Sequence, residues 1–359
     1  MATTSATTVN ALTAGKLPKS APWALLAASL AVTIIGSYIM QAAGLTEDLN
    51  WIGAVLLGVI LFVIANYVIA FLVEGRRQAT DRFVTSLVVS AFTVALIPLV
   101  WLLVTVVQNG LGTMLNGTFL DNSMRNVVGE GGGALHAIVG TLIITGIAAL
   151  ISIPIGLLTA IYLVEYGRGR LARGITFFVD VMTGIPSIVA GLATFALFVI
   201  FFGAGVKMGF AGSVALSILM IPVVVRSSEE ILKLVPNELR EASYALGVPK
   251  WLTILKVVLP TATAGITTGI MLSISRVIGE TAPLLIVAGF TTSMNYNPFS
   301  ERMQSLPVFT YNQYISPGTD AQAYFDRAWA GALTLIIIVA ILNAIARIVS
   351  HYFSPKLGR

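Results

Sequence analysis

The chain has 359 residues, of which 57% are hydrophobic and only 10% are charged; its net charge is +5 and it contains no cysteine. Soluble globular proteins carry about 25% charged residues, because charges keep a folded surface hydrated. This chain has too few charges to cover a particle of its size, so the sequence predicts an integral membrane protein. The lack of cysteine excludes disulfides, thiol nucleophiles and cysteine-ligated metals, and two distant histidines are too few for a histidine metal site.

Eight apolar stretches follow a Thr-, Ala- and Ser-rich segment of residues 1–20, which is expected to be a disordered cytoplasmic tail. Each stretch is long enough to cross a ~30 Å hydrocarbon layer as a helix, and none shows strand-like alternation. The first is longer than the core of a usual signal peptide, so we expect it to be retained. The predicted fold class is therefore all-α, with eight transmembrane helices. The expected spans are residues 21–44, 51–73, 83–107, 134–164, 175–202, 210–225, 261–290 and 328–350.

The positive charges predict the orientation of these spans. With the N-terminus inside, sixteen of the 21 Lys and Arg residues fall in cytoplasmic segments, four fall in external segments, and Arg276 lies within a span. Cytoplasmic segments of membrane proteins are enriched in Lys and Arg, so both termini are expected to be cytoplasmic. The same bias explains the basic net charge, and no nucleic-acid partner is expected.

The longest cytoplasmic loop, residues 226–260, is punctuated by helix signals. Ser227 and Glu230 form a capping-box pattern, which predicts a short helix. Pro236 is expected to open a second helix and Gly247 to end it. A third short helix is expected over residues 250–259, and it leads through Pro260 into the next span.

The second of these helices contains a recognisable motif. Glu241-Ala242-Ser243, then Gly247, then Leu259-Pro260 resemble the EAA motif of ABC importer permeases, with Ser243 in place of Ala and Val257 in place of Ile. The resemblance implies that Glu241, Ala242, Ser243, Gly247, Leu259 and Pro260 belong to a coupling segment that docks on an ATPase subunit. A helix lying on the membrane surface is the alternative, but it would need a basic face and bulky apolar anchors.

The chain lacks the Gly-x-x-x-x-Gly-Lys-Ser/Thr loop that binds nucleotide phosphates. We therefore expect it to bind no cofactor, and we expect ATP and Mg²⁺ to be used by a separate subunit.

Two charges lie inside the seventh stretch. Arg276 and Glu280 are four residues apart, so they are expected on one helix face, close enough to pair. A charge at mid-membrane costs about 2.5–3.5 kcal/mol, which indicates a function. The two residues could simply fix helix packing. Alternatively, the planar guanidinium could bind an oxyanion, while the carboxylate limits its affinity and accepts a hydrogen bond from protonated phosphate.

Pro186, preceded by Gly184 and followed by Ser187, predicts a break in the fifth stretch. A broken helix offers free backbone N–H groups to a substrate at membrane depth, although a simple proline kink is the alternative. Gly265 and Gly269 form a small-residue pair suited to close helix packing, within the chain or against a second permease.

The segment from Arg276 to Leu285, Arg-Val-Ile-Gly-Glu-Thr-Ala-Pro-Leu-Leu, resembles the seventh-span signature of phosphate-importer permeases of the PstA type. Gly184-Ile185-Pro186-Ser187 and Leu306-Pro307-Val308 match that family as well, and the likeness runs from about residue 136 to 353. It implies that Arg276, Glu280, Gly184, Pro186 and Ser187 line the substrate path.

The resemblance also implies partners, location and domain organisation. The partners are a second homologous permease, a dimer of ATPase subunits, an external phosphate-binding protein and the lipid of the bacterial cytoplasmic (inner) membrane. Residues 21–107 would hold two extra helices and the first helix of a six-helix permease core. Residues 108–133 would form an external loop, and residues 134–353 the rest of the core with its coupling loop, 226–260.

Three other functions are weighed against phosphate import by alternating access. A permease for sulfate or molybdate has less use for the carboxylate of Glu280. An ion-coupled secondary transporter predicts inverted repeats with paired broken helices, and gives no reason for the loop at 241–260. An intramembrane enzyme is not expected, because no Ser/His, paired Asp or His/Glu constellation is visible.

Overall fold

The computed structural model describes residues 17–18, 20–44 and 50–353. The expected disordered tail, residues 1–20, lies almost entirely outside the described residues. Within the described ranges every regular element is helical and no strand occurs, so the predicted all-α fold is confirmed. The chain divides into two compact units, Met1–Leu103 and Val104–Arg359.

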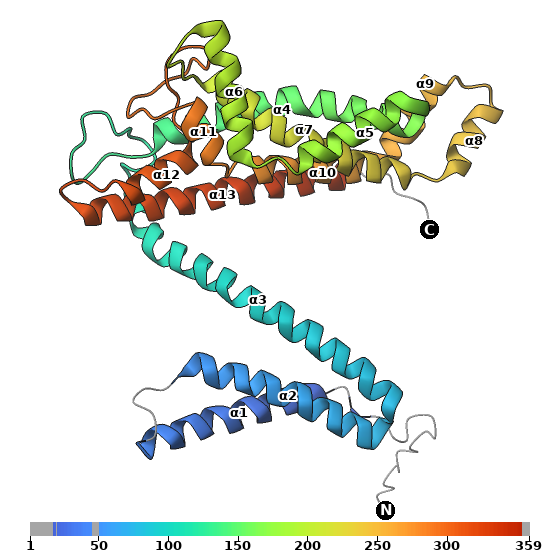
Figure 1. The fold of residues 1–359 in the computed structure, drawn as a ribbon, viewed down its shortest axis with the longest axis vertical. Helices are drawn as coiled ribbons and strands as arrows, with labels where there is room; N and C mark the ends of the chain where they lie inside the picture. The colour runs from blue at the N-terminus through green and yellow to red at the C-terminus, as the bar shows by residue number, and fades with distance from the viewer. Residues whose placement is uncertain (1–16, 19, 45–49, 354–359) are drawn as a thin grey trace, which may run out of the picture. The chain divides into compact units, whose positions relative to one another are not determined.

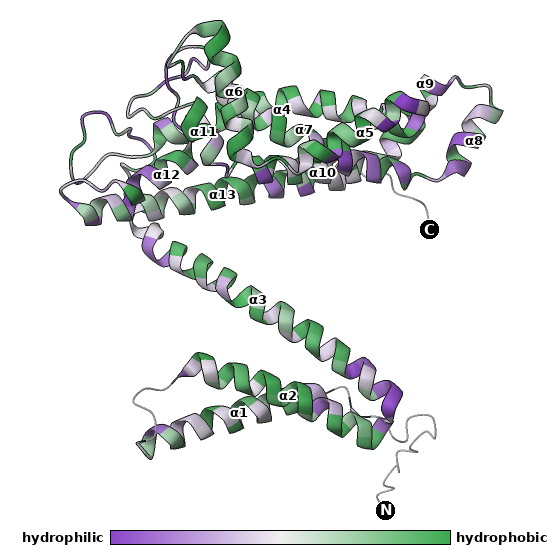
Figure 2. Cartoon of the chain, viewed as in Figure 1, coloured by the Kyte–Doolittle hydropathy of each residue, from purple (hydrophilic) through white to green (hydrophobic). Residues whose placement is uncertain are grey.

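The first unit is built from apolar helices joined by small and polar contacts. Gly58 lets α1 and α2 approach closely, because a Cβ there would lie 2.7 Å from Thr33 Oγ1. Asn66 of α2 donates a 2.7 Å hydrogen bond to Ser86 Oγ of α3. Most other side chains are apolar and exposed, as in helices that face lipid (Figure 2). The helices are α1 Ala21–Ala42, α2 Trp51–Glu74 and α3 Arg76–Leu115, the last of which continues into the second unit.

The second unit is a bundle in which α4, α7, α10 and α13 lie side by side (Figure 1). Helices α6, α11 and α12 gather toward one end of it, and α8 and α9 lie at the other. The elements are α4 Leu135–Ile161, the π-helical turn η1 Tyr162–Tyr166, α5 Gly169–Thr183, α6 Ser187–Phe202, α7 Gly209–Lys233, α8 Asn237–Ala245, α9 Lys250–Thr253, the π-helical turn η2 Ile254–Val258, α10 Leu259–Val277, α11 Ala282–Val287, α12 Leu306–Ile315 and α13 Ala321–Phe353.

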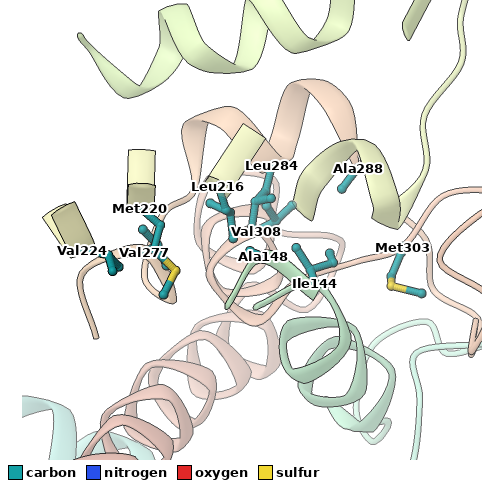
Figure 3. Close-up of a cluster of buried hydrophobic side chains, with 10 residues drawn as sticks. All are labelled: Ile144, Ala148, Leu216, Met220, Val224, Val277, Leu284, Ala288, Met303 and Val308. Atoms are coloured by element: carbon teal, nitrogen blue, oxygen red, sulfur yellow. The ribbon is translucent and has the colours of Figure 1, made fainter. Parts of the chain in front are cut away.

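Helix α7 is the centre of this bundle. In its most apolar stretch 61% of the residues are buried, against 28% or less in the other candidate spans. Leu216, Met220 and Val224 of α7 meet Ile144 and Ala148 of α4 in the largest buried cluster, shown in Figure 3. Burial of this kind fixes the bundle's helices relative to one another, and therefore the loops at both of its ends.

Seven described helices are long and apolar enough to span a membrane. The fifth expected span, residues 175–202, is not one straight helix: α5 and α6 meet at an angle of 108°. The break expected at Pro186 is thus present, and the total of eight spans holds only if this bent pair crosses as one.

The seventh expected span, residues 261–290, is wrong as a single helix, because α10 ends at Val277 and α11 begins at Ala282. Proline has no backbone N–H, and its ring clashes with the carbonyl four residues earlier in a helix. For Pro283 that residue is Gly279, so a continuous helix is blocked there. Arg276 and Glu280 were expected to share a helix face. They do not, because Glu280 lies beyond the end of α10.

Two expectations for the cytoplasmic loop are also wrong. No helix starts at Ser227: α7 runs through to Lys233, and Ser227 Oγ donates to the carbonyl of Val223 at 2.9 Å. Serine in a helix interior commonly bonds the carbonyl one turn back, so the capping-box pattern with Glu230 was coincidental. The third expected helix, residues 250–259, is not a separate short helix either. The chain is helical from Lys250 to Val277, with a π-helical turn just before Pro260, so the expected continuity through that proline is confirmed.

Candidate functional site

The coupling loop is organised around α8. The helix begins after Pro236 and is followed by Gly247, whose φ of +74° favours glycine. The Gly247 N–H donates to the Tyr244 carbonyl at 2.9 Å, and the Val248 N–H to the Ser243 carbonyl at 3.2 Å. These bonds satisfy carbonyls that a helix end leaves free, so both predicted ends of this helix are confirmed.

The motif residues of α8 divide into an outer and an inner set. Glu241 and Ala242 are exposed, and Leu246 just beyond the helix is 83% exposed. Ser243 is buried, and its Oγ lies 2.8 Å from Thr253 Oγ1 in α9. The helix therefore presents a carboxylate and small or apolar groups outward, and is fastened inward to the helical segment that begins at Lys250.

That segment connects the loop to the middle of the bundle. It is helical without interruption from Lys250 to Val277. Leu259 packs against a buried cluster that includes Val258 and Ala262, while Pro260 is exposed. Arg276 lies about 16 residues beyond Pro260, or ~24 Å along a helix. Leu259 and Pro260 of the motif are thus parts of the same helical segment as Arg276.

Sequence reasoning missed the strongest polar contact of this region. Arg240 of α8 pairs with Glu165 of η1, with Nη2 2.9 Å and Nε 3.0 Å from the carboxylate. A second link joins Lys250 Nζ to the backbone carbonyl of Glu165, and the ammonium lies 4.9 Å from the Tyr166 ring centroid. The only signal in the sequence was a single acidic residue closing the apolar stretch 134–164.

The break between α5 and α6 spans Gly184 to Pro186. Gly184 and Pro186 are exposed and Ser187 is half-buried at the first position of α6. Pro186 has an extended conformation, with φ −59° and ψ 138°, and its carbonyl accepts from the Val189 N–H at 2.9 Å. Helix α6 therefore starts at this break with free N–H groups in its first turn.

The break between α10 and α11 lies beside α6. A Cβ on Gly191 of α6 would lie 2.7 Å from the Cα of Pro283 in α11, so only glycine allows this approach. Arg276 is exposed at the end of α10, and Glu280 is half-buried within the break. In the part of the chain that the structure describes, no ion pair joins Arg276 to Glu280.

The two interrupted helix pairs thus meet where α6 contacts α11, and the exposed Arg276 lies six residues before α11 begins. No side-chain hydrogen bond between these charges and Gly184, Pro186 or Ser187 occurs among the described residues. The arrangement suits a small oxyanion, which could be bound by the fork of Arg276 and by backbone N–H groups at the start of α6.

Two other sequence features find their partners within the chain. Asp180 in α5 accepts a hydrogen bond from Arg226 of α7, which also contacts Glu229 at 2.7 Å. Gly265 and Gly269 pack against Ile231 and Ser227 of α7, where a Cβ would lie 2.6 Å from each side chain. The small-residue pair therefore joins α10 to α7, and the idea that it packs against a second permease is corrected.

The chain is similar to known transport proteins. Residues 152–359 match the family model described as binding-protein-dependent transport system inner membrane component. The chain is 49% identical over 276 residues to "Phosphate transport system permease protein PstA 1" of Mycobacterium tuberculosis (strain CDC 1551 / Oshkosh), covering 76% of this chain and 90% of that protein. It is 39% identical over 277 residues to "Phosphate transport system permease protein PstA" of Pasteurella multocida (strain Pm70), covering 76% and 95%.

The fold also resembles a solved structure, an inward-facing conformation of the MetNI methionine ABC transporter. The TM-score is 0.51 at 21% sequence identity, and the match covers 62% of this chain and 96% of that chain.

Proposed function

Because the chain belongs to the family of inner membrane components of binding-protein-dependent transport systems, we propose that it is the permease subunit of an ATP-driven phosphate importer. It is a multi-pass protein of the bacterial inner membrane and a transport component, not an enzyme. The main structural support for the anion path is the exposed guanidinium of Arg276, which ends the helical segment that begins in the coupling loop. The relatives named for phosphate transport support the choice of cargo.

In this proposal phosphate crosses beside the two helix breaks. The Arg276 fork binds phosphate oxygens, and the N–H groups and hydroxyl around Ser187 complete the contact. Gly184 and Pro186 keep those N–H groups free by interrupting the helix. Glu280 accepts a hydrogen bond from the protonated oxygen of phosphate and keeps the anion from binding too tightly to leave.

Transport is driven from the coupling loop. Glu241, Ala242 and the exposed side of α8 dock on an ATPase subunit, which binds ATP and Mg²⁺; this chain binds no cofactor. Gly247 ends the helix, and the contact between Ser243 and Thr253 passes its movement to the segment that contains Leu259, Pro260 and Arg276. Rigid transmission of this kind lets one short helix tilt a whole span.

The remaining partners follow from the same system. A second homologous permease closes the path, a dimer of ATPase subunits provides the work, and an external phosphate-binding protein delivers the anion. Sulfate or molybdate is the alternative cargo. Phosphate is favoured because a fully ionised oxyanion has no proton to offer the carboxylate of Glu280.

Uptake of labelled phosphate by cells carrying the assembled importer tests the proposal. Arg276→Ala should abolish uptake with assembly intact, Glu280→Gln should weaken selection of phosphate over sulfate, and Glu241→Ala should impair coupling to ATP hydrolysis. Arg125→Ala, an exposed arginine of the external loop, is the matched control and should transport normally. Normal phosphate uptake by all three variants would contradict the proposal.

A further inference from the structure

The cytoplasmic end of α4 is a meeting point of three segments. The carboxylate of Glu165 accepts both bonds from Arg240 of α8, and its backbone carbonyl accepts from Lys250, the first residue of α9. One residue of α4's terminal turn thus contacts the coupling helix and the start of the segment that leads to Arg276.

Arg240 extends the same junction to α7. Its guanidinium also donates to the carbonyls of Leu232 and Val235, at 3.0 and 2.6 Å. The Arg240 and Glu165 side chains are only 12% and 5% exposed, so water competes weakly for their hydrogen bonds. The pair therefore holds α8 against the ends of both α7 and α4.

This junction matters because α8 lies at the end of the bundle (Figure 1). Its only covalent connections are the short links before Asn237 and after Ala245. A helix attached by such links alone could move without displacing the bundle. A buried ion pair to α4 makes a displacement of α8 act on α4, which packs against α7 throughout the core of Figure 3.

We infer that Glu165 and Arg240 are positioning residues that couple the movement of α8 to α4. This link acts in addition to the contact between Ser243 and Thr253, which connects α8 to the segment containing α10. The inference rests on the proposed function, because it assigns these residues to the transmission step of that importer. The π-helical turn Tyr162–Tyr166, in which Glu165 lies, is a form often found at functional sites.

A plain structural brace is the competing explanation, and the two make different predictions. A brace that only stabilises the loop would change the amount of assembled importer, or reduce transport and ATP hydrolysis in proportion. A coupling pair would change the number of ATP molecules hydrolysed for each phosphate imported, because α8 would move without moving α4.

The experiment uses the complete importer, reconstituted in lipid vesicles with its ATPase subunits and phosphate-binding protein. Phosphate uptake and ATP hydrolysis are measured on the same preparation. We expect Glu165→Gln and Arg240→Gln each to raise the ATP-per-phosphate ratio about fivefold or more, the range of a moderate coupling energy. Arg240→Lys, which keeps a positive donor beside Glu165, should stay closer to the wild-type ratio than Arg240→Gln.

Glu74→Gln is the matched control. It breaks another ion pair with a buried carboxylate, Glu74 with Arg82 at 2.5 Å, which belongs to the first unit. Its ratio should equal that of the wild type. If a Gln variant does not assemble, Glu165→Asp provides the test, because the shorter side chain withdraws the carboxylate from Arg240 and should raise the ratio as well.

An unchanged ratio in assembled Glu165 variants would overturn the inference. Failure of the proposed cargo is a separate result, seen as wild-type hydrolysis of ATP without phosphate import. In that case the rate of ATP hydrolysis without the binding protein decides. The inference requires this basal rate in Glu165→Gln to approach the rate measured with the binding protein. An unchanged basal rate contradicts the inference.

Discussion

At the scale of single residues, the proposed path depends on positions where a side chain would not fit. Gly191 brings α6 onto Pro283, and Gly269 brings α10 onto Ser227. Gly191 is not distinguished in the sequence from other glycines of the chain, whereas Gly269 stood out only through its spacing from Gly265. Gly146 of α4, for example, has no atom within 4 Å of where its Cβ would be.

The contact at Gly191 leads to a prediction. Gly191→Val should push α6 away from α11, since the new Cβ would start 2.7 Å from the Cα of Pro283. Overpacking of this kind costs about 1–3 kcal/mol, so we expect a large loss of phosphate uptake in correctly inserted protein. Uptake by membrane vesicles checks this, with Gly146→Val as the control. Equal uptake by the two variants would show that the approach of α6 to α11 is dispensable.

At the scale of helices, prolines and glycines predicted some ends and not others. Pro236 and Gly247 marked the ends of α8, and Pro186 marked the break before α6, because each acts on its own backbone. Pro283 has the same local effect, yet the break at Gly279 was overlooked because the surrounding residues are apolar. At Pro260 the helix continues, as expected, after a π-helical turn.

The end of α8 allows a test of its rigidity. Gly247→Ala places a Cβ on a residue at φ +74°, which costs about 1 kcal/mol and should loosen the last turn. Gly247→Asn should cost less, because asparagine tolerates this conformation better. We expect the ATP-per-phosphate ratio to rise in the order Gly, Asn, Ala. An alanine variant that couples as well as the wild type would mean that this cap does not stiffen the coupling helix.

Long-range pairs set the limit of what the sequence could reveal about the candidate site. Arg276 and the EAA-like residues stood out because charge and spacing are local properties. The pairing of Arg240 with Glu165, 75 residues away, and of Arg226 with Asp180, 46 residues away, depends on how the helices pack. Such partners follow only from the three-dimensional arrangement of the helices.

At the scale of the second unit, a buried arginine ties distant parts of the chain together. Arg327 of α13 donates to Gln313 of α12 at 3.0 Å, and to the carbonyls of Gly129 and Gly131 at 2.7 and 3.0 Å. The side chain is buried and lies over the Tyr324 ring. It therefore fixes the long loop before α4 to the two last helices.

Removing this tie should destabilise the fold more than it affects the substrate path. Arg327→Leu leaves the buried Gln313 without its donor, which costs about 1–3 kcal/mol, and removes the tie to the Gly129 and Gly131 carbonyls. We expect a clear drop in the midpoint of thermal unfolding in detergent, while the surviving protein still binds its partners. Arg125→Leu, which changes an exposed arginine of the same loop, should unfold at the wild-type temperature. Matching midpoints for the two variants would refute the assignment.

The π-helical turn Ile254–Val258 has one further consequence. Such a turn holds one residue more than an α-helical turn, and in an α-helix each residue advances the chain by about 100° around the axis. If this turn became α-helical and its extra residue moved into the loop before it, every later side chain of the segment would rotate by about that angle. A change of register near the membrane surface would then swing the Arg276 guanidinium from one wall of the bundle to another, with no bond in α10 broken.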